Sequence, residues 1–361
     1  MKPAALVVAV IAIAGASAGS ARAQGAAGVY GVQGAGVNSE RGCDGCGARI
    51  DSALAGGALI GVRGTANVDG AVSAIVALEA GLLPDYGRAD QSGLLFGRLA
   101  YVGLTSHSGV IAIGRRHNLG YLALTEVGDP FKGGNSGNRI IHSGRQVDNS
   151  ITVYSREVFG VSAGASYGAL YGAGARAENG AGNRAWGVSI GFEHGPLTIR
   201  AAHQNRNAAP VAPATPMGNN LDARNAIVAA NLRIGSATAY AAYSATRGWG
   251  NLPLFNPDNP YSASMASAPS TDSRDVLVGL ALPCGPTTLL ASYVRKNDRN
   301  LLNRDANQVA FGASHALSRY TDFYASYSRI IDRNDAGHTV GNGGLRRVGA
   351  SALNLGMRHG F

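Results

Sequence analysis

The pattern closest to a catalytic motif is a pair of overlapping G-x-S-x-G stretches, residues 160–164 and 164–168, centred on Ser162 and Ser166. In hydrolases this pattern holds a serine nucleophile on a sharp turn from a strand into a helix. No helical pattern follows either stretch, and both serines share one parity of a strand rich in glycine and alanine. We therefore interpret them as strand residues and not as nucleophiles.

Other patterns that support catalysis or metal binding are missing from the sequence. The eight histidines are dispersed, and neither an H-E-x-x-H motif, a Walker loop nor a dinucleotide-binding glycine fingerprint occurs. Carboxylate pairs such as Asp332 and Asp335 fall in expected loops, where they suit solvation or cation binding better than catalysis. The sequence predicts no enzyme activity, no metal site and no cofactor.

The three cysteines are Cys43, Cys46 and Cys284. Cys43 and Cys46 have the spacing of a zinc half-site, of a redox C-x-x-C pair or of a local disulfide. No second ligand pair stands at zinc spacing, and no βαβ pattern supports thioredoxin-type chemistry. In an oxidising compartment the spacing favours a disulfide that stiffens a loop, which leaves Cys284 over.

The first residues predict export. Lys2 precedes an apolar run over 4–14, and the tripeptide A-R-A stands at 21–23. This order matches the basic region, apolar region and cleavage site of a secretory signal peptide. The alternative, a membrane anchor, is disfavoured because the apolar run is too short to cross about 30 Å of hydrocarbon. We expect a signal peptide over 1–23 and one domain over 24–361.

The rest of the chain breaks into segments of roughly ten residues in which apolar side chains alternate with small or polar ones, as in transmembrane β-barrels. The expected strands are 26–37, 58–66, 71–80, 94–105, 109–117, 146–156, 159–171, 184–194, 196–206, 224–234, 236–247, 274–282, 287–297, 307–316, 321–331 and 346–361. Short turns between them alternate with long loops such as 118–145. We therefore predict an all-β fold, a sixteen-stranded antiparallel transmembrane barrel.

Parity and composition agree with a barrel. In the last strand Leu353, Leu355 and Met357 share one side, and the chain ends in Phe361, a terminal aromatic residue expected to signal barrel assembly.

The 52 glycines oppose a helical protein, because Gly disfavours helix by roughly 1 kcal/mol relative to Ala. The formal charge of +9 becomes +7 once two basic residues, the only charges of 1–23, are removed. Scattered arginines on an exported chain suit a pore wall or anionic lipopolysaccharide better than nucleic acid.

Several stretches, in order along the chain, resemble the Gram-negative general porins, notably the type common in beta-proteobacteria. They are VYGV (29–32), GVRG (61–64), ALEAG (77–81), LFGRLAYVGL (95–104), IGR (113–115), DPF (129–131), RQVDNS (145–150) and NLGMRH (354–359). LFGRLAYVGL and NLGMRH are the more specific of these. The resemblance implies a trimeric barrel whose third long loop, here 118–145, folds inward and narrows the channel.

The resemblance also implies a constriction in which acidic groups on that loop face a row of arginines on the wall. The loop candidates are Glu126 and Asp129, although Asp129 could instead cap the turn before the next proline. The wall candidates are Arg98, Arg115 and Arg145.

The sequence departs from the family pattern at Leu59, where the family places a wall arginine. Arg63 or Arg49 could substitute, and Lys132 on the loop dilutes its acidic side. Rings of arginine in a narrow pore attract anions. Together with the mature charge, this predicts a weak preference for anions.

We thus expect an outer-membrane channel of a Gram-negative bacterium for passive diffusion of small hydrophilic solutes and ions. Its expected partners are two further copies of the chain, outer-membrane lipid and lipopolysaccharide, and the barrel assembly machinery acting through the C-terminal strand. No nucleic-acid partner is expected. Two alternatives stay open: a substrate-specific channel of the same fold, and an outer-membrane barrel without a channel, such as an adhesin.

Overall fold

The structure, a computed structural model, describes residues 25–42, 47–52, 57–84, 87–89, 94–134, 136–141, 144, 146–170, 183–207, 222–248, 272–334, 336, 338, 340 and 351–361. The predicted signal peptide, 1–23, lies outside these residues, as do Cys43, Cys46 and Arg145.

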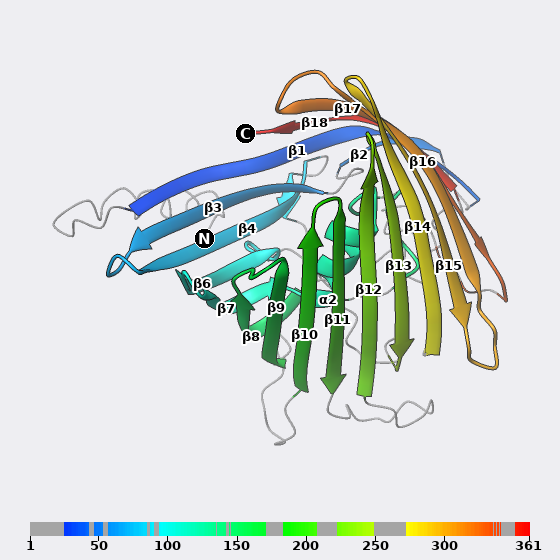
Figure 1. The fold of residues 1–361 in the computed structure, drawn as a ribbon. Coiled ribbons are helices and arrows are strands. Elements are labelled where there is room, and N and C mark those ends of the chain that lie inside the picture. Colours follow the sequence, from blue (N-terminus) through cyan, green and yellow to red (C-terminus); the bar gives the residue numbers. More distant parts are fainter. Residues whose placement is uncertain are drawn as a thin grey trace.

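Within this part of the chain, sixteen antiparallel strands close into one barrel (Figure 1). Closure comes from β1 (Gly25–Arg41), which pairs with β3 (Ala58–Asn67) on one side and with the last strand, β18 (Ser351–Gly360), on the other. The other strands of the ring are β4 (Val72–Leu83), β6 (Leu99–Ser106), β7 (Gly109–His117), β8 (Gln146–Ser155), β9 (Val161–Leu170), β10 (Asn183–His194), β11 (Leu197–Asn207), β12 (Asp222–Ile234), β13 (Ala237–Arg247), β14 (Asp272–Cys284), β15 (Thr287–Asp298), β16 (Ala306–Ala316) and β17 (Thr321–Asp332). Two short strands, β2 (Ala48–Ser52) and β5 (Arg88–Ala89), extend the sheet beside β1 and β4. The predicted sixteen-stranded fold is confirmed.

Some strand ends differ from the prediction because pairing extends past the alternating pattern. β1 continues to Arg41 instead of ending at 37, although Asn38 and Glu40 look like loop residues. There β1 pairs with both β18 and β2, and Asn38 Nδ2 donates to Glu40 Oε1 (2.8 Å) and Asp51 Oδ2 (3.2 Å). Backbone pairing on both edges thus overrides local polarity.

Side chains alternate between an apolar outer face and a more polar inner face. In β18, Leu353, Leu355 and Met357 are 45%, 51% and 45% exposed, while Asn354 is fully buried. This confirms the parity expected from the sequence. Exposed apolar side chains on the outer face suit contact with lipid. The backbone of the strands can also lie in lipid, because barrel closure pairs its polar groups.

One connection, between β7 and β8, folds back along the inside of the wall. Asn118 begins α2 (Leu119–Leu122) by accepting a hydrogen bond from the Gly120 N–H at 3.0 Å, and α2 continues into the π-helical turn η2 (Ala123–Gly128). We call residues 118–134 and 136–141 the inner segment; its helical ribbon lies within the ring of strands (Figure 1). Among the described residues, no helix is long and apolar enough to span a membrane.

The buried core lies between the inner segment and the wall that it covers. Leu124, Val127 and Ile140 of the segment are 2%, 3% and 0% exposed, and they cluster with Ile227 of β12 and Leu277 of β14. A hydrogen bond from Asn231 Nδ2 to the Val127 carbonyl (3.1 Å) adds a polar anchor. The segment is therefore packed against the inner wall over an apolar patch.

Glycines on the wall make room for the segment where it is bulkiest. A Cβ on Gly279 of β14 would lie 2.6 Å from Pro130 Cγ, and a Cβ on Gly312 of β16 would lie 2.8 Å from Phe131 Cε1. Both distances are too short for carbon–carbon contact. These two glycines seat Pro130 and Phe131 against the wall.

Candidate functional site

The first group of charged side chains lies on the inner face of β1, β3 and β4. Tyr30 donates a hydrogen bond from its hydroxyl to Glu79 Oε1 at 2.5 Å, and Arg98 Nε lies 3.6 Å from Glu79 Oε2. Glu79 and Arg98 are almost fully buried. Arg63 stacks over the Tyr30 ring, with its guanidinium carbon 5.1 Å from the ring centre, yet its side chain is exposed. Arg63 thus offers an exposed positive charge, whereas the charge of Arg98 is paired with Glu79.

A β-bulge in β7 directs a second arginine inward. Gly114 has a φ of 137°, which favours glycine, and the register with β8 shifts between Gly114 and Arg116. The guanidinium carbon of Arg116 lies 4.2 Å from the ring centre of Tyr101 and 5.3 Å from that of Tyr154. Two aromatic faces therefore hold Arg116 by cation–π attraction.

The structure does not bring Arg115 together with these inward arginines. Arg115 pairs across to Ala100, on the parity of the exposed Ile113. Its Nε donates to the Gly97 carbonyl at 2.6 Å, and its Nη1 forms an ion pair with Asp148. Of the two neighbouring arginines, Arg116 is therefore the one that lines the hollow, and the bulge that directs it inward cannot be read from the sequence.

The inner segment contributes Glu126 to the same region. Its Oε2 lies 2.7 Å from Arg200 Nη1 of β11, and the carboxylate remains about half exposed. Glu126 and Arg200 line one hollow of about 350 Å³ together with Arg63, Arg116, Tyr101 and Tyr154. The hollow therefore joins the inner segment to the basic side of the wall.

Asp129, the second acidic residue predicted for the loop, is directed into the inner segment itself. Its carboxylate accepts hydrogen bonds from the backbone N–H groups of Phe131 (3.0 Å), Gly133 (3.2 Å) and Asn138 (2.9 Å), and the residue is 2% exposed. This is the arrangement of a turn cap, the alternative that the sequence left open. Burial raises the pKa of Asp129 to about 6, although the three N–H donors oppose that rise.

The raised pKa of Asp129 makes the inner segment sensitive to pH. The folded protein holds this proton more tightly than the unfolded chain, so the stabilisation is complete below the ordinary pKa of 3.8 and is lost as pH rises through about 6. We expect the free energy of unfolding to fall between these pH values by an amount on the order of 2–3 kcal/mol. Urea unfolding of the wild type and of Asp129→Asn across this range measures it. An identical pH profile for the two proteins would contradict this assignment.

The C-terminal residue is fastened to the first strand. The Phe361 N–H donates to the Gly31 carbonyl at 3.0 Å, and the Gly31 N–H donates to the Phe361 carbonyl at 3.0 Å. The side chain of Phe361 remains 55% exposed. Its predicted role as an assembly signal stays a prediction.

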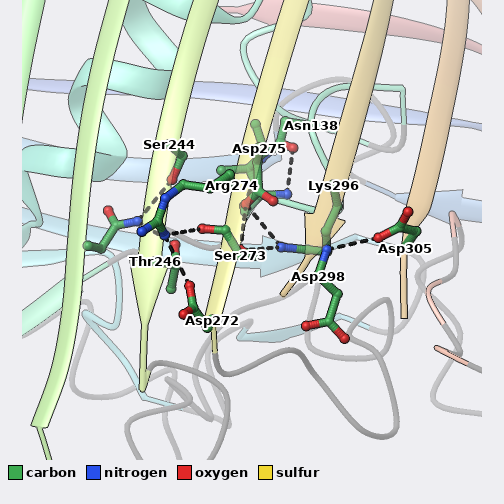
Figure 2. Close-up of polar contacts among 12 residues, drawn as sticks. Asn138, Ser244, Thr246, Asp272, Ser273, Arg274, Asp275, Lys296, Asp298 and Asp305 are labelled. Atoms are coloured by element: carbon green, nitrogen blue, oxygen red, sulfur yellow. Dashed lines mark hydrogen bonds and ion pairs between the residues drawn. The ribbon is translucent and has the colours of Figure 1, made fainter. Parts of the chain in front are cut away.

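A buried ion pair between β14 and β15 is indicated by no pattern in the sequence. Lys296 Nζ lies 3.0 Å from Asp275 Oδ2 and 3.1 Å from Ser273 Oγ, and the two charged side chains are 1% and 0% exposed (Figure 2). These residues stand on adjacent strands and far apart in the chain, so no local pattern connects them. Arg116, Arg200 and the two tyrosines around Arg116 were missed for the same reason.

A closed barrel with an apolar outer face and charged side chains inside is the architecture of bacterial outer-membrane barrels. The chain belongs to the Gram-negative porin family, whose model matches residues 7–336. It is accordingly an outer-membrane channel for passive diffusion.

Solved structures of porins share the fold. The anion-selective porin from Comamonas acidovorans superposes with a TM-score of 0.72 at 20% identity, over 94% of this chain and 100% of that chain. OmpF of Salmonella typhi, in complex with daunomycin, gives 0.69 at 17% identity, over 93% and 97%. The trimer form of OmpT of Vibrio cholerae gives 0.63 at 17% identity, over 93% and 99%. No match was found among curated protein sequences.

Proposed function

We propose that the inner segment narrows the bore as a constriction and that exposed arginines beside it give the channel a weak preference for anions. The observation that carries this proposal is the charge imbalance around the hollow. Arg63, Arg116 and Arg200 stand against one carboxylate, Glu126, which is already paired with Arg200. Positive charge in a narrow aqueous passage with low-dielectric walls attracts anions.

The other residues predicted for the constriction contribute less to this field. Arg98 is paired with Glu79, and the carboxylate of Asp129 is taken up by backbone N–H groups. Arg63 supplies the positive charge that the family pattern has at position 59, where this chain has Leu59. Both residues lie on the inner parity of β3. Arg49 is held by Glu40 at 2.8 Å. The constriction roles of Arg115 and Arg145 remain predictions.

The sign of the reversal potential in a planar bilayer under a salt gradient tests the proposal. We expect a modest anion preference in the wild type and a smaller one in Arg63→Gln. One unpaired charge about 8 Å from a passing ion contributes about 0.5 kcal/mol in water, roughly a twofold change in the permeability ratio.

Arg329→Gln serves as the matched control. Arg329 lies on β17 with the outward parity of Tyr327 and is exposed, so its loss should leave the permeability ratio unchanged. A cation-favouring wild type, or equal shifts in the two variants, would overturn the anion proposal. A barrel that passes no current would favour the adhesin alternative.

We also propose four properties of the whole protein. Residues 1–23 act as a cleaved signal peptide, and 24–361 form the barrel domain. The chain assembles as a homotrimer, as OmpT of Vibrio cholerae does in the trimer form. The apolar outer strands contact lipid and lipopolysaccharide, and the strand that ends in Phe361 engages the assembly machinery. N-terminal sequencing of the purified barrel and its mass in detergent test the first two.

A further inference from the structure

Five arginines on the outer face of the barrel form a row at one level. They lie on β12, β13, β14, β15 and β17, and we call them the arginine arc: Arg224, Arg247, Arg274, Arg295 and Arg329. Each has the outward parity of exposed residues on its own strand, such as Val228 or Tyr327. The side chains are accessible, since those of Arg247, Arg274 and Arg295 are 67%, 32% and 47% exposed.

The strands place the arc at the outer edge of the apolar band. Each of its arginines lies eight to ten residues from the end of its strand at the short turns. At about 3.3 Å per residue, on strands tilted by about 40°, this is a height of roughly 20–25 Å, comparable with an apolar band about 25 Å tall. Tyr243, Tyr293 and Tyr327 stand on the same parity, six residues from the same ends, as in an interfacial aromatic girdle. The arc therefore lies at the membrane boundary on the side of the long loops, which faces the outer leaflet.

The ion pairs along the arc leave it with an excess of positive charge. Arg224 and Arg247 stand directly opposite each other on neighbouring strands, which is unfavourable for two like charges. Asp272 is shared, because its carboxylate lies 3.8 Å from Arg247 Nη2 and 3.1 Å from Arg274 Nη1 (Figure 2). One carboxylate cannot neutralise two guanidinium groups, so the arc attracts an anion from the membrane side.

The extent of the arc indicates which anion it suits. Arg295 is about half exposed although Asp305 Oδ2 lies 3.5 Å from it, and Arg329 is exposed as well. Guanidinium groups bind phosphate through paired hydrogen bonds. Neighbouring strands lie about 4.8 Å apart, so the arc covers roughly 24 Å of the barrel surface from β12 to β17. This suits a lipid with several separated phosphates, such as lipopolysaccharide, better than a phospholipid with one.

We propose that the arginine arc binds the phosphate groups of lipopolysaccharide, with the acyl chains of that lipid against the apolar band. The inference rests on the lipopolysaccharide contact proposed above and deepens it. Apolar strands alone would accept any lipid, whereas the arc assigns recognition to phosphate and to one side of the barrel. The arc lies outside the bore, so the inference is independent of the ion selectivity of the channel.

The affinity for fluorescently labelled lipid A, measured by anisotropy in a neutral detergent, tests the arc. The triple variant Arg247→Gln, Arg295→Gln and Arg329→Gln should raise the Kd roughly a hundredfold, since each basic residue at an anionic lipid surface accounts for about a fivefold change. Its single-channel conductance should equal that of the wild type, which shows that the barrel is folded.

The matched control is the triple variant Arg156→Gln, Arg233→Gln and Arg319→Gln. It removes three exposed arginines from the rim of the short turns and should leave the Kd unchanged. Equal losses of affinity in the two triple variants would overturn the inference. Equal affinity for lipid A without its phosphates, or displacement by phosphatidylglycerol at the same concentration as by lipid A, would overturn it too.

The same titrations separate this inference from the contact on which it rests. If the wild type binds lipid A and the arc variant binds it equally well, only the assignment to the arc is wrong. If the wild type does not bind lipid A, the lipopolysaccharide contact proposed above is wrong as well.

Discussion

Replacing Lys296 by methionine should lower the free energy of unfolding of the barrel by about 3–5 kcal/mol, the usual cost of leaving one member of a buried ion pair alone. Lys296 Nζ lies 3.0 Å from Asp275 Oδ2, and the two side chains are 1% and 0% exposed. Methionine fills most of the same volume but leaves the Asp275 carboxylate buried without its countercharge (Figure 2). Urea unfolding in lipid vesicles, followed by tryptophan fluorescence, measures the loss.

Two controls separate the buried charge from the loss of packing. The double variant Lys296→Met with Asp275→Asn removes both charges and keeps a polar partner for Ser273, so it should be much more stable than Lys296→Met alone. Arg247→Gln breaks an exposed pair with Asp272, at 3.8 Å, and should cost between 0 and about 1 kcal/mol. Equal stability of the single and double variants would refute the electrostatic explanation.

The ion pair shows which part of the architecture could be predicted from the sequence. Barrel strands can be predicted from local sequence, because each strand alternates apolar and polar residues over its own length and ends at turn residues. That period placed the outer face of β18 correctly from Leu353, Leu355 and Met357. Contacts such as that of Lys296 with Asp275 depend on the register between neighbouring strands. The alternation tells which face a side chain lies on, but it does not tell which residues of two strands lie opposite each other.

Only part of the candidate site could be predicted from the sequence, because most of its contacts depend on how the strands pair. The resemblance offers Arg63 as a substitute for the wall arginine missing at Leu59, and in the structure Arg63 lines the hollow. The resemblance points to Arg115, which follows Gly114 in the matching stretch. The bulge at Gly114 arises from pairing with β8 and directs Arg116 inward, so no local pattern in the sequence indicates Arg116. The turn cap formed by Asp129 is instead a local feature, because a short aspartate side chain reaches the backbone N–H groups that follow it in the chain.

The inner segment itself is held by shape, and this leads to the second large effect. A valine in place of Gly279 should lower the single-channel conductance by roughly a quarter or more, since current through a narrow constriction depends on its open width. A Cβ at Gly279 would lie 2.6 Å from Pro130 Cγ and 2.8 Å from Pro130 Cδ. The strands of the wall are fixed by pairing on both sides, so the added side chain would push the inner segment toward the centre of the bore.

Gly312→Val should act in the same direction, because its Cβ would meet Phe131 Cε1 at 2.8 Å. Overpacking of this kind costs about 1–3 kcal/mol, which a barrel with intact strand pairing should survive. Ala241→Val is the matched control: Ala241 lies on β13 with the outward parity of Tyr243 and is exposed, so the added methyl groups stay outside the bore. Single-channel recording of the three folded variants decides the matter. If conductance in Gly279→Val and Gly312→Val equals that of Ala241→Val, the inner segment does not set the width of the passage, and the constriction must lie elsewhere along the bore.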